Sequence, residues 1–219
     1  MTVIEQWFRV FGRLGLPDDP HVLLSSPDDE ADVLTALSRV RPGARVVLLD
    51  IAWRPQSAPG DVGGSAAPRL SAAAFANGQG IAAGSLDAAL FDHALDDIIV
   101  DAVARHERIE YEGHRGEYAP TARAVRAYWR SGELEAVARP ALIQLVASCA
   151  TALKRAAPLV FCHRVASLDL PGQPMDLYTD YLALARSWVL SSDLGFREAP
   201  LDGFDPHWWM RLERAPEAA

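Results

Sequence analysis

The chain has 219 residues, of which half are hydrophobic and 23% are charged. This balance is typical of a globular protein with a substantial core, and the length suits one α/β domain. The net charge of −8 argues against nucleic acid or an anionic membrane as the main partner, because both attract clustered positive charge.

The first fifty residues predict a strand–helix–strand unit behind an N-terminal helix. Aromatic residues recur at helical spacing over residues 4–14, so this segment reads as an amphipathic helix. Two short apolar runs, residues 21–26 and 46–51, are expected strands with a helix between them. This spacing is a βαβ unit, which implies a parallel sheet and a right-handed crossover.

The middle of the chain alternates loop, strand and helix. Residues 54–84 are rich in Pro, Gly, Ser and Ala, which predicts a loop-rich segment with a short helix near residues 70–76. Residues 86–95 read as a buried strand that runs into a loop, and residues 96–109 as a helix that its own aspartates cap.

The second half continues this alternation and ends in two strands. The final pair is separated by a short connection, so we expect it to lie antiparallel at the sheet edge. The expected helices are 121–130, 140–155 and 175–190, and the expected strands are 159–165, 194–201 and 207–214.

This order of elements resembles class I S-adenosylmethionine-dependent methyltransferases, whose seventh strand runs antiparallel to the others. Asp50 ends the second strand, where the family places an acidic residue that binds the cofactor ribose. Residues 91–98 resemble the family's fourth strand and the loop after it, and the tail over residues 161–214 resembles a group of bacterial methyltransferase-like proteins. The resemblance covers most of the chain from His21 onward.

The resemblance implies an α/β fold, a Rossmann-like three-layer sandwich with a mostly parallel seven-stranded sheet and an antiparallel last strand. It also implies S-adenosylmethionine as the cofactor. We expect residues 1–219 to form a single domain, with residues 1–18 as the N-terminal helix and its lead-in.

The turn after the first strand departs from the family's pattern. The family has a GxGxG turn there, whose glycines let the backbone approach the cofactor, whereas residues 25–30 read SSPDDE. In one interpretation, Ser25 and Ser26, with Asp28 or Asp29, hold the amino-acid end of the cofactor. In the other, Ser26 is only the N-cap of the next helix and the cofactor site is lost.

The densest titratable cluster follows the expected central strand. Asp92 and Asp50 are expected cofactor-binding residues, because ligands of open α/β sheets collect at the carboxyl ends of strands. His93 is the expected general base, since histidine titrates nearest to neutral pH. Asp96 and Asp97 are more simply explained as the N-cap and first-turn acids of the next helix.

Residues 107–135 form a candidate substrate lid. The charged stretch within them brings together a second expected base, His114, and three expected substrate-binding residues, Tyr111, Arg115 and Tyr118. The guanidinium of Arg115 suits a carboxylate or phosphate on a substrate. The alternative is a solvated, charged loop.

His163, near the end of the fifth strand, is expected either to line the same crevice and bind substrate or to be a hydrogen-bonded core histidine. The sequence therefore predicts a small-molecule methyltransferase dependent on S-adenosylmethionine, or a repurposed member of that family. The alternative is a degenerate, non-catalytic protein that binds a partner or ligand. We expect no metal site. We expect a cytoplasmic location, without a leader or a membrane segment. A homodimer is compatible with the sequence.

Overall fold

The computed structural model describes residues 1–26, 29–51, 67–109, 118–163 and 175–214, with backbone only for residues 118–119 and 175–179. Its centre is a single seven-stranded sheet in the order β3-β2-β1-β4-β5-β7-β6. The strands are β1 (His21–Ser25), β2 (Arg45–Asp50), β3 (Arg69–Ser71), β4 (Ala88–Asp92), β5 (Leu159–Cys162), β6 (Phe196–Ala199) and β7 (Trp209–Arg214).

The direction of the strands matches the expectation. Strands β3, β2, β1, β4 and β5 pair with one another in parallel, and β7 pairs antiparallel with both β5 and β6. The predicted mostly parallel sheet with an antiparallel last strand is confirmed. The final two strands lie at the sheet edge as the short connection between them indicated.

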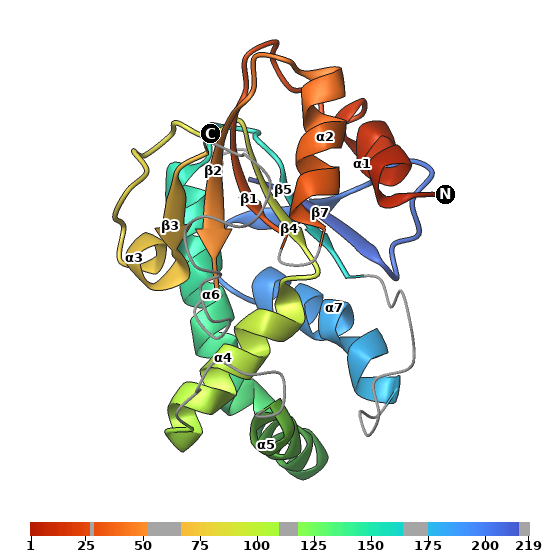
Figure 1. The fold of residues 1–219 in the computed structure, drawn as a ribbon. Coiled ribbons are helices and arrows are strands. Elements are labelled where there is room, and N and C mark those ends of the chain that lie inside the picture. Colours follow the sequence, from red (N-terminus) through yellow and green to blue (C-terminus); the bar gives the residue numbers. More distant parts are fainter. Residues whose placement is uncertain (27–28, 52–66, 110–117, 164–174, 215–219) are drawn as a thin grey trace.

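Helices cover both faces of the sheet, so the fold is the expected three-layer sandwich (Figure 1). In Figure 1, α1 and α2 lie together on one side, whereas α4, α6 and α7 lie on the other. The helices are α1 (Val3–Phe11), α2 (Glu30–Val40), α3 (Ala72–Ala76), α4 (Leu95–Glu107), α5 (Tyr118–Ser131), α6 (Leu134–Ala152) and α7 (Met175–Leu190).

Alternation along the central strands builds two separate cores. Phe91 and Phe161, opposite each other in β4 and β5, stack at 4.9 Å between ring centroids and face the core formed with α4, α6 and α7. Their neighbours Leu90 and Val160 face the core formed with α1 and α2. Because successive side chains of a strand point to opposite faces, a nearly continuous apolar run is needed when both faces are buried.

The largest differences from the prediction are at β3 and at the start of α6. Strand β3 was not predicted, because its three residues carry only one apolar side chain, Leu70. Helix α6 begins at Leu134 and not at Pro140, since the buried Leu134 and Ala138 pack into the core and extend the helix past the proline. No helix in the described ranges, including the 19-residue α6, combines the length and the apolar character that crossing a membrane requires.

The N-terminal helix is held to the sheet by Trp7. This side chain has no exposed surface and meets the ring of Trp209 in β7 edge-on, at 5.2 Å between centroids. The next residue, Phe8, is 47% exposed. Thr2 and Glu5 form a capping box, which fixes where the helix begins.

We expect Trp7→Ala to lower the free energy of unfolding by about 3–5 kcal/mol, because it leaves a cavity between α1 and β7. The matched control Phe8→Ala should change it by no more than about 0.5 kcal/mol. Urea denaturation of both variants measures the difference. Equal losses for the two variants would contradict the packing of α1 described above.

Candidate functional site

The carboxyl ends of the parallel strands meet at a topological switch point between β1 and β4. From β1 the chain goes on to β2 and β3 on one side, and from β4 it goes on to β5 on the other. In open α/β sheets the crevice at such a point is where ligands bind. The structure brings the predicted Ser25, Ser26, Asp50 and Asp92 to this edge, at the ends of three neighbouring strands.

Ser26 and Asp92 join β1 to β4 across the switch point. The Ser26 hydroxyl donates a hydrogen bond of 3.1 Å to Oδ2 of Asp92, and both side chains are buried. The interpretation of Ser26 as the N-cap of the next helix is therefore wrong, since α2 begins only at Glu30 and its N-cap position is Asp29. The physical reason is that a buried carboxylate needs a donor, and the hydroxyl supplies it. Ser25 is also buried, opposite Phe91 in the sheet.

Asp50 takes part in an ion-pair cluster at the end of β2. Nη1 of Arg69 lies 2.8 Å from Oδ1 of Asp50, and Nη2 of the same guanidinium lies 2.8 Å from Oε1 of Glu30. Nη2 also donates to the second oxygen of Glu30, at 3.1 Å. Partial burial of the guanidinium lowers its pKa, but the charges of Glu30 and Asp50 outweigh this effect, so the pKa of Arg69 is raised and the side chain stays protonated.

His93 occupies a strained turn at the end of β4. Its φ of 51° lies in the left-handed region, which residues with a Cβ rarely adopt. The backbone N–H of His93 donates to the carbonyl of Cys162 at 2.8 Å, which extends the pairing of β4 with β5 by one residue. The half-buried imidazole is thereby held beside the ends of the central strands.

The ring of His163 lies beside that of His93. Their ring centroids are 5.8 Å apart, and the ring of Tyr181 from α7 meets His163 edge-on at 5.5 Å. His163 is only 3% exposed, and its backbone N–H donates to Trp208. The structure therefore supports features of both interpretations, a core position and a place near the predicted base.

The acidic pair after His93 belongs to the start of α4. The helix begins at Leu95 with Ala94 at the N-cap position, and Asp96 and Asp97 lie in its first turn. Their prediction as first-turn acids is confirmed, and the prediction of an N-cap aspartate is wrong. Within the described ranges, no three His, Cys, Asp or Glu side chains are grouped as a metal ion would require.

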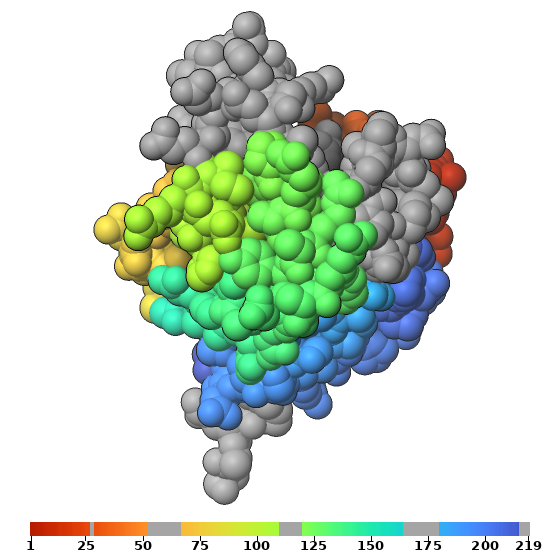
Figure 2. Space-filling model, turned by 90° about the horizontal axis from the view of Figure 1, so that it is seen from below, coloured from red at the N-terminus to blue at the C-terminus, as the bar shows by residue number. Residues whose placement is uncertain are grey.

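Residues 110–117 of the predicted lid lie outside the described residues. Asp28, Tyr111, His114 and Arg115 fall there, and Tyr118 begins α5 without a described side chain. Figure 2 shows α4 and α5, in yellow-green and green, side by side across the face seen from below. The roles of these residues in cofactor binding, catalysis and substrate binding stay predictions.

Three residues of this edge were not predicted from the sequence. Tyr181 lies within an ordinary helical apolar pattern that gave no signal. Glu30 reads as a first-turn acid, and Arg69 lies in a stretch that was interpreted as loop. The one available signal was that Arg69 is the only arginine or lysine between Arg54 and Arg105.

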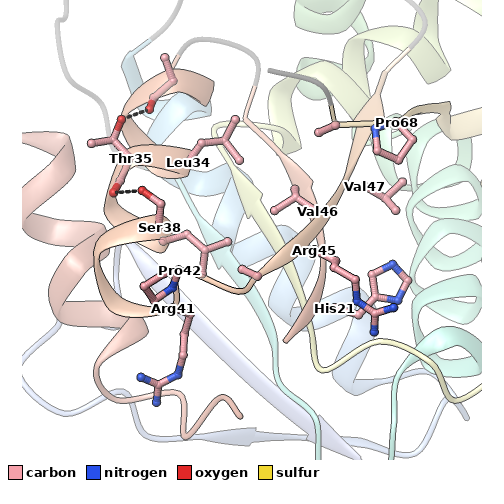
Figure 3. Close-up of a pocket in the computed structure, with 14 residues that line it drawn as sticks. His21, Leu34, Thr35, Ser38, Arg41, Pro42, Arg45, Val46, Val47 and Pro68 are labelled. Atoms are coloured by element: carbon pink, nitrogen blue, oxygen red, sulfur yellow. Dashed lines mark hydrogen bonds between the residues drawn. The ribbon is translucent and has the colours of Figure 1, made fainter. Parts of the chain in front are cut away.

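A groove lies between α2 and the outer part of β2 (Figure 3). Its volume is about 860 Å³, and it is lined by one face of α2, by Val46 and Val47, and by Pro68. His21 and Arg45, the first residues of their strands, lie at its rim. The groove runs along α2 from Ala31 to Arg41, and the chemical groups described above do not line it.

One solved structure is similar to this chain in fold. Human N-acetylserotonin methyltransferase in complex with S-adenosylmethionine matches 96% of this chain and 52% of its own, with a TM-score of 0.50 and 11% identity. The chain has the fold of class I methyltransferases. This confirms the predicted fold family, and the low identity restricts the likeness to the fold.

Two further solved structures align less closely. The pyocyanin biosynthetic protein PhzM aligns over 94% of this chain and 53% of its own, with a TM-score of 0.47 and 14% identity. A 16S rRNA (adenine(1408)-N(1))-methyltransferase from Catenulisporales acidiphilia aligns over 99% and 93%, with a TM-score of 0.43 and 13% identity. The chain spans about half the length of N-acetylserotonin methyltransferase and PhzM. No family model and no curated protein sequence matches it.

The strained turn at His93 gives a test of the site's geometry. We expect His93→Gly to be more stable than His93→Ala by roughly 1 kcal/mol, because glycine adopts a positive φ without a Cβ clash. At the exposed helical residue His106 the order should reverse, with Ala favoured by up to about 1 kcal/mol. Thermal or urea unfolding of the four variants measures both differences. Alanine and glycine of equal stability at position 93 would contradict the left-handed turn.

Proposed function

We propose that the chain is an S-adenosylmethionine-dependent methyltransferase, or a repurposed member of that family, that acts on a small molecule. The observation that carries the proposal is the position of the polar residues. Ser25, Ser26, Asp50 and Asp92 lie at the switch point of a sheet that has the class I strand order. The fold shared with human N-acetylserotonin methyltransferase, which was solved with S-adenosylmethionine bound, supports the same assignment.

The chemistry of these residues fits the proposed cofactor. S-adenosylmethionine carries a ribose diol, which donates hydrogen bonds to carboxylates, and a sulfonium and an ammonium group, which are cationic. Asp50 at the end of β2 is the proposed ribose ligand, as the family resemblance implies. Ser25, Ser26 and Asp92 at the ends of β1 and β4 are proposed to lie toward the amino-acid end.

The protein's own part in methyl transfer is small. The bound cofactor supplies an electrophilic methyl group, and the protein must align an acceptor with it in a site that excludes water. We assign His93 as the base that takes a proton from an acceptor hydroxyl or amine. Its position between the end of β4 and the buried His163 supports this role.

A second candidate is a non-catalytic protein of the same fold that binds a partner or ligand. The observation that favours it is the absence of glycine from residues 25–30. A Cβ at each of these positions keeps a bound molecule farther from the backbone than the family's glycines do. The ion pair of Asp50 with Arg69 adds to this, because the carboxylate already has a cation beside it.

The two candidates differ in whether the chain binds the methyl donor. We expect S-adenosylmethionine and S-adenosylhomocysteine to bind with micromolar affinity, roughly −8 kcal/mol at 1 μM, in isothermal titration calorimetry. Asp50→Ala should weaken binding by at least about tenfold, because a charged hydrogen-bond acceptor is lost. The exposed Asp193→Ala is the control and should leave binding unchanged.

The absence of heat for both ligands from a folded sample would overturn the methyltransferase proposal and leave the non-catalytic candidate. Binding that is equally strong in Asp50→Ala would keep the cofactor but overturn the assignment of its ribose site. If the donor binds, a screen of small hydroxyl and amine acceptors with a radiolabelled methyl group follows. His93→Ala should then reduce kcat by roughly 10²–10⁴ with little change in donor affinity.

A further inference from the structure

Arg69 connects three elements at the carboxyl edge of the sheet. It is the first residue of β3, and its guanidinium reaches Glu30 at the start of α2 and Asp50 at the end of β2. Glu30 directly follows the turn after β1, where the family has its glycines. The two carboxylates that Arg69 joins therefore lie together on the β1–β2 side of the proposed cofactor crevice.

We infer that Arg69 is a positioning residue for the nucleoside end of the cofactor, which it serves by fixing the Asp50 carboxylate and the start of α2 relative to each other. This inference rests on the proposed function. It goes beyond that proposal by assigning a role to Arg69 and Glu30. Their ion pair would orient the crevice, as a glycine-rich backbone turn does in the family's pattern.

The hydrogen-bond pattern of the cluster supports a positioning role. Arg69 takes only Oδ1 of Asp50, and no hydrogen bond from a described residue reaches Oδ2. The Asp50 side chain is 32% exposed, so this second oxygen can accept a ribose hydroxyl while the ion pair stays in place. A carboxylate fixed by one partner loses less conformational entropy when it binds the next ligand.

The absence of glycine after β1 explains why an ion pair between Arg69, Glu30 and Asp50 would be needed. Where a glycine turn packs against the cofactor, the backbone itself sets the width of the crevice. Here residues 25–30 include no glycine. Arg69 holds the start of α2 toward β2 through both oxygens of Glu30, and this fixes the spacing between the start of α2 and the end of β2.

The opposite role for Arg69 makes a different prediction. If the guanidinium competed with the ribose for Asp50, its removal would free the carboxylate and strengthen binding. If Arg69 instead paired directly with the cofactor's own carboxylate, its contribution would not depend on Asp50. A double-mutant cycle separates these cases, because two residues that act through one contact have non-additive effects.

The experiment titrates S-adenosylhomocysteine into the whole chain and into Arg69→Gln, Arg69→Lys, Asp50→Asn and the double variant Arg69→Gln/Asp50→Asn. Arg139→Gln is the matched control, because Arg139 forms an ion pair with Glu135 of similar length, 2.9 Å, within α6. Thermal unfolding of each variant is measured in parallel.

We expect Arg69→Gln to weaken binding by roughly tenfold, since it removes a charged hydrogen bond to Asp50. Arg69→Lys should restore part of the affinity, because an ammonium group retains the charge but not the planar geometry that reaches both carboxylates. When Asp50 is already Asn, adding Arg69→Gln should weaken S-adenosylhomocysteine binding by less than about twofold further. Arg139→Gln should have no effect on binding.

Every other outcome overturns either the positioning role of Arg69 or the proposed function. Unchanged or tighter binding by Arg69→Gln would overturn the positioning role, as would a full tenfold loss in the Asp50→Asn background. A loss of affinity accompanied by an equal fall in folded population at the titration temperature would assign Arg69 to stability alone. If the unaltered chain binds no S-adenosylhomocysteine, the proposed function itself fails, and the inference falls with it.

Discussion

The parallel pairing of β1 with β4 at the centre of the sheet is the constraint on which the rest of this structure depends. Crossovers leave this pair in opposite directions, so helices cannot cover the space directly beyond the two carboxyl ends. Both faces of the pair are buried, which demands the apolar runs of β1 and β4 and leaves polar residues only at their ends. The hydrogen bond from Ser26 to Asp92 closes this edge between the two strands.

Around that edge, residues 25–30 lack the glycines of the pattern that the resemblance implies. Glycine turns bring amide groups close to a ligand, whereas at this edge the structure has a hydroxyl–carboxylate pair and an ion-pair cluster. Such contacts have a different energetic character. A half-exposed ion pair contributes little stability by itself, which is consistent with the proposal that the cluster of Glu30, Asp50 and Arg69 orients the site.

A site residue could be predicted from the sequence where its signal lay in neighbouring residues, and not where it lay in a contact with a distant residue. Asp50 and Asp92 were predicted as site residues because they directly follow apolar runs, and the carboxyl ends of parallel strands converge. Ser26 was assigned both to a ligand site and to a helix cap, and the sequence had no means to decide between them. Its hydrogen-bond partner Asp92 lies 66 residues away in the sequence. The place of the Ser26 side chain therefore depends on a buried contact between two strands.

The sequence by itself determined the alternation of strands and helices, the two-sided burial of the central strands, and the antiparallel final pair. These follow from local hydrophobic periodicity and from short connections, which are properties of neighbouring residues. Only the tertiary structure decided that Arg69 joins Glu30 to Asp50, that His93 turns with a positive φ beside His163, and that Tyr181 lies against that ring. Such contacts depend on the register of strands and on how helices lie across the sheet, and no local pattern encodes these.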